Sequence, residues 1–372
     1  MAQWVAQIYL RHFRNYRELH LSLSPGMHLF LGPNGAGKTN FLEAVHFLAT
    51  GHPMRGTRAG DLVQFEQQQA YLKARVKLGT QEVSIEWMVD RKLGKAAKLN
   101  GLPVRRQQEI TQLMPVVYFC PDHIQLLKGS PNERRGQLDE LLRQLYPSYG
   151  HDLLRYQQAL KQRNEVLRQI AGRKASLGDL EYWEEPLFHH GLKIIEKRMQ
   201  MVEQLGPLLT SAYRRIANSE DELGIVLLQP YAAEGQTIAS SEDWQTCQKR
   251  WLQEELRRGY TMVGPHRDDY RFTLGSADAR HFASQGQQRS IVLSLLFSEL
   301  RLIENVRHQK ALLLLDDVFS ELDEQRRNQL IELLTPEQQT FLTATDWSSI
   351  SPDQPPPDTK VFRVEHGAIR AS

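Results

Sequence analysis

The sequence predicts an α/β fold that is split by an inserted and mainly helical second domain. Three observations carry this prediction. An apolar run at residues 29–31 leads into a glycine-rich loop and then into apolar residues at helical spacing. Helical patterns prevail from about residue 130 to about residue 258. After residue 264, short apolar runs alternate with helical segments once more.

The composition is that of an ordinary globular chain. Its 372 residues exceed one typical compact core, and 41% of them are hydrophobic and 24% charged. No apolar run approaches the roughly 20 residues of a membrane span, and residues 1–10 do not form a targeting signal. Cys120 and Cys247 make neither a disulfide framework nor a metal cluster. We therefore expect a cytoplasmic protein without a membrane partner.

Strands are predicted before residue 120. Apolar residues at 5, 8, 10 and 13 predict the first, and residues 70–78 and 82–89 alternate as a hairpin with Gly79 and Thr80 at its turn. Residues 116–119 predict another short strand.

Helices dominate the middle of the chain. They are predicted at residues 133–146, 149–171 and 182–217. Pro186 and Pro207 predict breaks in the last of these. A strand at 223–228 and a polar helix at 244–257 follow.

The α/β pattern resumes near the end of the chain. Apolar residues from Ile291 to Ile303 predict a strong helix, and residues 322–334 predict another. Strands are predicted at residues 311–315, 340–345 and 361–364.

The glycine-rich loop fits the phosphate-binding pattern G-x-x-x-x-G-K-[ST]. A strand, a glycine loop and a helix place backbone N–H groups and the positive end of the helix dipole around an anion. Lys38 would add a mobile charge for the β- and γ-phosphates of ATP, and the Thr39 hydroxyl is placed to bind Mg²⁺. The predicted nucleotide-binding residues of this segment are Gly32, Pro33, Asn34, Gly35, Ala36, Gly37, Lys38, Thr39 and Asn40.

An acid pair ends the apolar strand at residues 311–315. Such a strand is how proteins with a phosphate-binding loop place a carboxylate beside Mg²⁺. We assign Asp316 to the metal side and hypothesise that Asp317 is the general base for the hydrolytic water. The alternative is a strand that ends in two solvated aspartates.

A third motif precedes the helix that contains Ile291. Ser284, Gly286 and Gln287 stand at its start, where a small polar residue and a glycine expose N–H donors to an anion. A plain N-cap by Ser284 is the alternative. The order of glycine loop, S-x-G-Q and acid pair is that of ABC-type ATPases, so we predict an ABC-type (SMC-like) ATPase domain. Its halves would be residues 1–129 and 259–372, with residues 130–258 as the helical insertion.

Several further segments resemble the RecF family of bacterial recombination-mediator ATPases, relatives of the SMC proteins. They are Phe13-Arg14-Asn15-Tyr16, Gly129-Ser-Pro-Asn-Glu-Arg134-Arg135, Leu160-Lys-Gln-Arg-Asn164, Gly264-Pro265-His266-Arg267 and Leu312-Leu-Leu-Leu-Asp316-Asp317. Together with the glycine loop and the S-x-G-Q motif they span nearly the whole chain in the family's order.

The resemblance implies a function that composition cannot show. RecF-like proteins form an ATP-dependent homodimer in which each glycine loop faces its partner's Ser284–Gln287 segment. The dimer clamps double-stranded DNA or junctions of single and double strands, and slow hydrolysis releases it. RecR and RecO are the implied partners in loading RecA at gaps. The resemblance also places Arg14 and Asn15 beside the nucleotide, and His266 and Arg267 near nucleotide or DNA; a capped turn is the alternative for the last two.

Positive charge for DNA must be gathered locally, because the net charge is only +2. The candidate phosphate contacts lie in the predicted insertion: Arg134, Arg135, Arg155, Lys161, Arg163, Arg168, Arg173, Lys174, Lys193, Lys197 and Arg198. A solvated helix face is the alternative for each.

Three other classes of protein share some of these motifs. A transporter ATPase has no place for the insertion, and an SMC-type tether needs an uninterrupted heptad arm that this chain lacks. A related nuclease needs a further acid cluster to hold catalytic metals.

Overall fold

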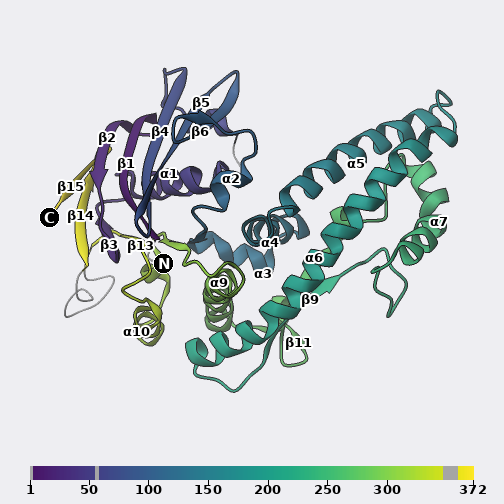
Figure 1. Ribbon diagram of the computed structural model, residues 1–372. Coiled ribbons are helices and arrows are strands. Elements are labelled where there is room, and N and C mark those ends of the chain that lie inside the picture. Colours follow the sequence, from purple (N-terminus) through teal and green to yellow (C-terminus); the bar gives the residue numbers. More distant parts are fainter. Residues whose placement is uncertain (1–2, 55–57, 347–358) are drawn as a thin grey trace. The chain divides into compact units, whose positions relative to one another are not determined.

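A computed structural model describes residues 3–54, 58–346 and 359–372 (Figure 1). The chain divides by its contacts into two compact units. The first, here called the sheet unit, contains residues 1–123, 212–219 and 289–372, and the second, the helical unit, contains residues 124–211 and 220–288. The domain boundaries predicted after residues 129 and 258 stay predictions, since contacts group residues by compactness and not by function.

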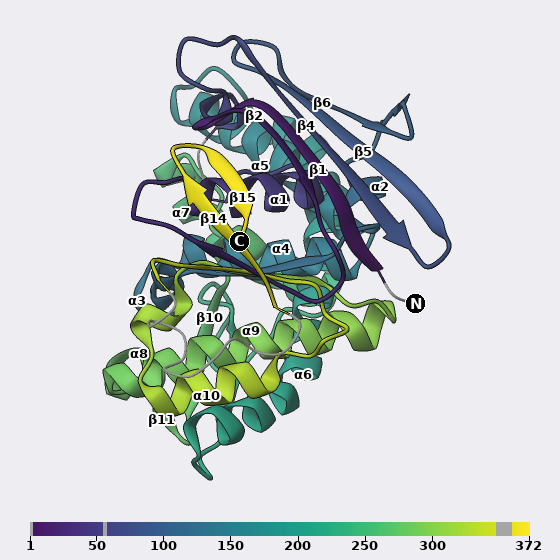
Figure 2. The ribbon, with the colours of Figure 1, turned by 90° about the vertical axis from the view of Figure 1, so that its left-hand side faces the viewer.

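The sheet unit contains a six-stranded antiparallel sheet, whose strands lie side by side in Figure 2. In spatial order these are β2 (Tyr16–Ser22), β1 (Gln3–Phe13), β4 (Gln69–Leu78), β5 (Gln81–Asp90), β6 (Gly94–Leu99) and β7 (Leu102–Pro103). Side chains alternate along β4, where Ala70, Leu72, Ala74 and Val76 are buried. The predicted hairpin is confirmed, with Gly79 at φ +61° in its turn.

A second sheet of the same unit has a parallel core. In spatial order its strands are β15 (Ala368–Ala371), β14 (Lys360–Glu365), β3 (Met27–Leu31), β13 (Thr340–Ala344), β12 (Leu312–Leu315) and β8 (Val116–Phe119). Only β15 runs antiparallel to its neighbour. All four leucines of β12 are buried, as expected for a central parallel strand. The strands predicted at 116–119, 311–315 and 340–345 are therefore confirmed within one residue.

Helix α1 (Lys38–Thr50) joins the two sheets into one core. It packs against β4 and β5 of the antiparallel sheet and against β8 and β13 of the parallel one. Phe41, Leu42, Val45 and Leu48 are fully buried, and the other residues from 41 to 50 are buried as well, so the helix is enclosed on all sides. The other helices of the unit are α2 (Gln108–Thr111), α10 (Glu324–Leu333) and most of α9 (Gln285–Arg307), with short 3-10 helices at Ala59–Leu62 and Val318–Glu321.

The helical unit is built on long helices and a small antiparallel sheet. Its helices are α3 (Gln125–Lys128), α4 (Pro131–Leu145), α5 (Tyr149–Ala171), α6 (Gly178–Ala217, to residue 211), α7 (Ser241–Arg258) and α8 (Ala279–Phe282), with a 3-10 helix at Pro265–Arg267. Another 3-10 helix, Pro121–Ile124, lies at the boundary between the two units. Its strands are β9 (Leu223–Leu228), β10 (Asp269–Leu274) and β11 (Ala277–Asp278). Ser130 and Ser240 start α4 and α7 with capping boxes to Glu133 and Asp243.

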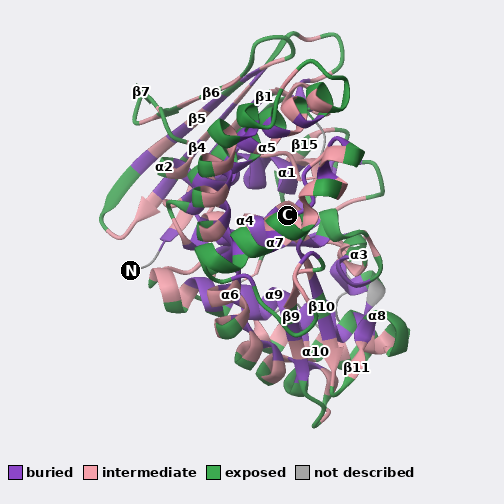
Figure 3. Cartoon of the chain, turned by 90° about the vertical axis from the view of Figure 1, so that its right-hand side faces the viewer, coloured by how far each residue is buried: buried purple, intermediate pink, exposed green. Residues whose placement is uncertain are grey.

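The predicted breaks at Pro186 and Pro207 are wrong, because α6 is one helix with both prolines inside it. Each interior proline costs a helix about 3 kcal/mol through its missing N–H and its ring. The cost is outweighed by burial along the helix, where Leu187, Ile194 and Leu205 are at most 2% exposed. Buried and exposed residues alternate along α6 (Figure 3).

Candidate functional site

The glycine loop runs from the end of β3 to the start of α1, and its backbone demands glycine at particular positions. Gly35 and Gly37 have φ of +80° and +118°, in the left-handed region. A Cβ on Gly32 would lie 2.2 Å from the Val364 carbonyl oxygen, and one on Gly37 would lie 2.4 Å from the Asn15 amide nitrogen. The loop can close against its neighbours only because these side chains are absent.

Lys38 lies at the first position of α1, where its charge joins the helix dipole. Its Nζ donates hydrogen bonds to the carbonyl oxygens of Gly32 (2.6 Å) and Pro33 (3.1 Å), so the ammonium group folds back over the loop. Burial lowers the pKa of Lys38, while the charges of Asp317 and Asp316 act in the opposite direction. Carbonyl oxygens are neutral partners, and a phosphate can replace them at this cation.

The acid pair meets the glycine loop at the end of β12. The Thr39 hydroxyl donates to Asp316 Oδ1 at 2.9 Å, and the Thr343 hydroxyl of β13 donates to the same oxygen at 2.8 Å. A hydroxyl and a carboxylate are hard oxygen ligands of the kind that Mg²⁺ prefers, so the residues present fit this ion. Asp317 has φ +48°, and its N–H donates to Thr343 Oγ1 at 2.9 Å. The strained backbone of Asp317 is held by the same threonine that holds Asp316.

The turn between β1 and β2 supports the glycine loop from outside. Asn15 Nδ2 donates to the Ala36 carbonyl at 3.0 Å, and Asn40 Nδ2 donates to Asn15 Oδ1 at 2.8 Å. The Tyr16 hydroxyl donates to the Gly37 carbonyl at 2.9 Å. Asn15 and Asn40 thus lie at the loop, as two of the predicted nucleotide-binding residues.

Arg14 contacts a different residue of α1. Its Nε and one terminal nitrogen bind the two carboxylate oxygens of Glu43 at 2.8 and 3.1 Å, and its other terminal nitrogen donates to the Asp61 carbonyl at 3.0 Å. The Glu43 side chain is only 4% exposed, whereas that of Arg14 is 23% exposed. Nucleotide contact by Arg14 stays a prediction.

The S-x-G-Q motif belongs to the helical unit, unlike the glycine loop. Ser284 caps α9: its Oγ accepts from the Gln287 N–H at 3.3 Å, and Gln287 Oε1 accepts from the Ser284 N–H at 2.9 Å. Ser284 is exposed, and Gly286 and Gln287 are half-buried. The N-cap geometry is present, and a role of these residues toward a nucleotide stays a prediction.

Three residues at the site escaped the sequence interpretation. They are Thr343, Tyr16 and Glu43, which contact the acid pair, the glycine loop and Arg14 respectively. A threonine in a fully buried strand is a signal that could have pointed to Thr343, because a buried hydroxyl needs a partner. No such signal pointed to Glu43, which lies among apolar residues of α1 in the sequence.

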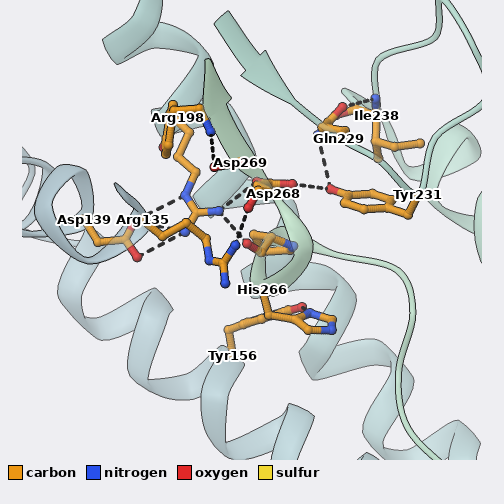
Figure 4. Close-up of polar contacts among 12 residues, drawn as sticks. Arg135, Asp139, Tyr156, Arg198, Gln229, Tyr231, Ile238, His266, Asp268 and Asp269 are labelled. Carbon is orange, nitrogen blue, oxygen red and sulfur yellow. Dashed lines mark hydrogen bonds and ion pairs between the residues drawn. The ribbon is translucent and has the colours of Figure 1, made fainter. Parts of the chain in front are cut away.

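Three of the candidate DNA contacts are wrong, since Arg134, Arg163 and Arg198 are buried within the helical unit. Arg198 lies between two carboxylates, with nitrogens 2.9 Å from Asp139 Oδ1 and 2.7 Å from Asp268 Oδ2 (Figure 4). Its guanidinium also donates to the Pro265 carbonyl at 2.6 Å. A buried arginine that is fully paired cannot reach a DNA phosphate without unfolding its surroundings.

The other two arginines have the same structural role. Arg163 pairs with Glu255 at 2.7 Å and donates to the Thr261 hydroxyl at 2.9 Å. Arg134 pairs with Asp269 at 2.7 Å. These ion pairs join segments that are far apart in the sequence into one helical unit.

His266 is also a structural residue. Its Nδ1 lies 2.6 Å from the Tyr156 hydroxyl and its Nε2 lies 3.1 Å from the Thr261 carbonyl, so both ring nitrogens are engaged. Burial lowers the pKa of His266 to about 4, which keeps the ring neutral. The neighbouring Arg267 is exposed and makes no ion pair within the described residues.

The glycine loop, the acid at the end of a buried parallel strand and the capped S-x-G-Q turn together define a P-loop ATPase of the ABC type. The family model described as "RecF/RecN/SMC N terminal domain" matches residues 4–351. Among the residues that the structure describes, no helix has both the length and the apolar character to cross a membrane.

Relatives and solved structures narrow the class to one family. The chain is 35% identical to the DNA replication and repair protein RecF of Heliobacterium modesticaldum, over 99% of both chains. It is 36% identical to that of Symbiobacterium thermophilum, over 98% of both. A solved structure of the recombination mediator protein RecF with ATP, in the RecFOR pathway, has a TM-score of 0.91 at 30% identity and covers 100% of this chain and 98% of its own.

An Smc head domain from Pyrococcus furiosus has a TM-score of 0.56 at 15% identity, over 100% of this chain and 96% of its own, and shares the fold alone. The chain belongs to the RecF family, whose members are ABC-type P-loop ATPases of DNA replication and repair. The predicted fold class and family are thereby confirmed.

Proposed function

We propose that this chain is a cytoplasmic, ATP-driven clamp for DNA in recombinational repair. It binds ATP with Mg²⁺, dimerises on the nucleotide, holds duplex DNA or a junction of single and double strands, and releases it upon slow, DNA-stimulated hydrolysis. One observation carries the catalytic part: Thr39 and Asp316 meet at 2.9 Å at the mouth of the glycine loop. These two residues come from opposite ends of the sequence and converge where a nucleotide's metal would be bound.

The loop residues Gly32–Asn40 would cradle the phosphates, with Lys38 turning from the loop carbonyls to the β- and γ-phosphates. Mg²⁺ would be held by the Thr39 hydroxyl and, through water, by Asp316, and would neutralise phosphate charge. Asp317 would accept the proton of the attacking water as the bond between the γ-phosphorus and the ADP oxygen breaks. Arg14 would contribute a further positive charge beside the nucleotide.

Dimerisation follows from a difference in affinity. ATP can drive association only if it binds the closed dimer better than the monomer. The start of α9, with Ser284, Gly286 and Gln287, would approach the γ-phosphate held by the partner protomer. The Ser284 Oγ only accepts in the cap, so its hydroxyl hydrogen would serve as a donor to that phosphate. Hydrolysis removes that phosphate, so the dimer opens.

The exposed basic residues of the helical unit, unlike its buried arginines, would contact the phosphates of DNA. Five of the predicted candidates are exposed and form no ion pair within the described residues: Arg155, Lys161, Arg173, Lys174 and Lys193. Arg267 adds a sixth. Contacts of this kind give sequence-independent affinity that falls steeply with salt. Solved structures of RecF are described as belonging to the RecFOR pathway, which supports RecR and RecO as partners of this chain.

The decisive experiment is light scattering of the full chain with and without ATP, Mg²⁺ and duplex DNA. We expect the mass of the wild type to double with ATP. Ser284→Arg should retain ATP binding and fail to dimerise, whereas Ser276→Arg, at an exposed turn of the same unit, should dimerise normally. A wild-type chain that remains monomeric at saturating ATP and DNA would overturn the proposal.

A further inference from the structure

Thr343 is a polar side chain inside the parallel sheet, and the proposed hydrolysis assigns it no task. It lies on β13, whose five residues are all buried, and Thr343 itself is 0% exposed. Strand β13 lies between β3, which leads into the glycine loop, and β12, which leads into the acid pair. A hydroxyl in such a place needs hydrogen-bond partners within the protein, since it does not reach water.

The register of the sheet brings Thr343 beside the first acid. Leu315 of β12 pairs with Leu342 of β13. The residues that follow them, Asp316 and Thr343, therefore lie side by side at the carboxyl ends of the two strands. Thr343 also comes two positions after Phe341, so both point to the same face of the sheet. The ring of Phe341 packs against a ring of α1, which puts Thr343 on the face where α1 begins.

The hydroxyl of Thr343 makes one hydrogen bond to each acid of the pair. It donates to Asp316 Oδ1 at 2.8 Å and accepts from the Asp317 N–H at 2.9 Å. A backbone N–H only donates and an ionised carboxylate only accepts, so the single hydroxyl hydrogen goes to Asp316. A β-branched side chain has few rotamers, and this stiffness keeps the hydroxyl in its place between the two acids.

The bond to Asp316 decides which oxygen of that carboxylate is left for a metal ion. Oδ1 accepts from Thr343 at 2.8 Å and from Thr39 at 2.9 Å, which occupies both of its lone pairs. Among the described residues, no side chain or backbone group donates a hydrogen bond to Oδ2. Oδ2 is therefore the oxygen that faces a metal-bound water. Without the Thr343 hydroxyl, the carboxylate is free to turn and exchange its two oxygens.

The bond from Asp317 fixes the second acid by a different route. Asp317 has φ +48° and ψ 32°, a left-handed conformation that residues other than glycine rarely adopt. Such a backbone persists only where its surroundings hold it. The Thr343 hydroxyl accepts the Asp317 N–H, and the Ser320 hydroxyl donates to the Asp317 carbonyl at 2.8 Å. Because this turn sets the direction of the Asp317 side chain, Thr343 acts on that carboxylate through the backbone.

We propose that Thr343 is a positioning residue of the ATPase reaction. Its one hydroxyl gives the two acids their separate roles, since it turns Asp316 Oδ2 toward the metal side and holds Asp317 in the turn that aims it at the attacking water. The inference rests on the proposed function, in which Asp316 binds Mg²⁺ through water and Asp317 is the general base. Replacing a residue that orients the groups around a metal ion typically costs about 10- to 100-fold in metal affinity or activity.

The test compares two buried threonines of the same strand. Thr343→Val keeps the shape of the side chain and removes the hydroxyl. Thr340→Val is the matched control, because Thr340 is 1% exposed and its hydroxyl forms, within the described residues, one long hydrogen bond of 3.4 Å to the Gln338 carbonyl. Electron paramagnetic resonance of Mn²⁺ with AMP-PNP, a non-hydrolysable ATP analogue, measures metal affinity without turnover. We expect a loss of about tenfold or more for Thr343→Val and wild-type affinity for Thr340→Val.

Two further measurements separate positioning from a merely structural role. Thr343→Ser restores the hydroxyl and should bind Mn²⁺ like the wild type, whereas a role in packing alone would favour the valine. ATP affinity in EDTA, measured by calorimetry, should be unchanged in all three variants, because the glycine loop and Lys38 supply the phosphate contacts. At saturating Mg²⁺ the kcat of Thr343→Val should remain low at an unchanged KM, since added metal does not restore the hydrogen bond to Asp317.

The outcomes distinguish this inference from the proposed function. Wild-type metal affinity and kcat in Thr343→Val would overturn the inference and leave the proposed function intact, and full recovery of kcat at saturating Mg²⁺ would overturn the role toward Asp317. A wild type that binds AMP-PNP without any metal ion would overturn the proposed function and the inference with it. If Thr343→Val does not fold, Thr343→Ala is compared with Thr343→Ser, which differs from it only by the hydroxyl, and equal metal affinity of these two would overturn the inference.

Discussion

The glycine-loop site of the sheet unit and the ion-pair network of the helical unit both hold a buried cation, and they hold it in opposite ways. Lys38 is 7% exposed and bonds only to backbone carbonyl oxygens within the described residues. Arg198 is 1% exposed and lies between the carboxylates of Asp139 and Asp268. One cation has neutral partners that a ligand can replace, and the other has its charge fully matched inside the protein.

The partners of a basic residue, and not its type, therefore decide whether it can bind a ligand. A buried charge is costly unless it is paired, so Arg198 must keep both of its aspartates. Lys38 tolerates partial desolvation at a lowered pKa, and it gains most when an anion arrives. We expect the largest effect on the free energy of unfolding, when Arg198 is replaced. We expect the smallest on the affinity for ATP, when a residue that supports the glycine loop is replaced.

Arg198→Met should break the helical unit. The substitution leaves Asp139 and Asp268 without their cation, and removing one partner of a buried pair costs about 3–5 kcal/mol. Urea unfolding followed by circular dichroism measures the loss. Arg155→Met, at an exposed site of α5, is the control and should change the free energy of unfolding by less than about 0.5 kcal/mol. Equal curves for the two variants would show that the network has no stabilising role.

Lys38→Met should impair ATP turnover and leave the stability of the protein almost unchanged, the opposite of the expectation for Arg198→Met. It removes the charge aimed at the phosphates, so turnover of ATP should fall by about 100-fold or more, while the urea midpoint changes little. Steady-state phosphate release measures the rate, and Lys92→Met, an exposed lysine of the same unit, should retain full turnover. Normal hydrolysis by Lys38→Met would remove this residue from the site.

The buried His28 makes the stability of the sheet unit depend on pH. His28 lies between the rings of Phe341 and Phe362, and burial lowers its pKa from 6.5 to about 4. The unfolded chain therefore takes up a proton that the folded chain refuses, and stability falls as the pH drops from 6.5 toward 4. The loss from this residue amounts to about 2 kcal/mol at pH 5.

His28→Phe should remove that part of the acid sensitivity, and thermal unfolding from pH 8 to pH 5 measures it. The exposed His281 serves as the control, since His281→Phe should leave the pH profile of unfolding as it is. An unchanged profile for His28→Phe would mean that His28 does not contribute to acid unfolding.

Asn15→Ala should have the smallest effect, a fall in ATP affinity of about tenfold at most, since each lost hydrogen bond is worth about 1 kcal/mol. The change removes the bonds to Ala36 and Asn40 that brace the glycine loop. Isothermal titration calorimetry gives the affinity. Asn100→Ala loses a comparable bond to Ser84 far along the sheet, and it should lower stability without touching ATP affinity.

Prediction from sequence succeeded where the signal is local. The glycine loop, the helix after it and the hairpin of β4 and β5 each depend on spacing within about 20 residues, and all three were found. Strand β2 was missed, because its alternation is short and broken by Arg17 and Glu18. The continuity of α6 was missed for a different reason: the burial that outweighs its prolines comes from other segments of the helical unit.

The phosphate loop could be predicted from sequence alone, because Gly32, Gly37, Lys38 and Thr39 form a motif of eight consecutive residues. The sequence also determined the family, through motifs in a fixed order. Thr39 and Asp316 were both predicted to bind Mg²⁺, and the structure brings them together across 277 positions. The burial of Arg163 and Arg198 in ion pairs, by contrast, is visible in the structure alone. Burial and pairing arise from contacts between distant segments, and a pattern along one chain does not contain them.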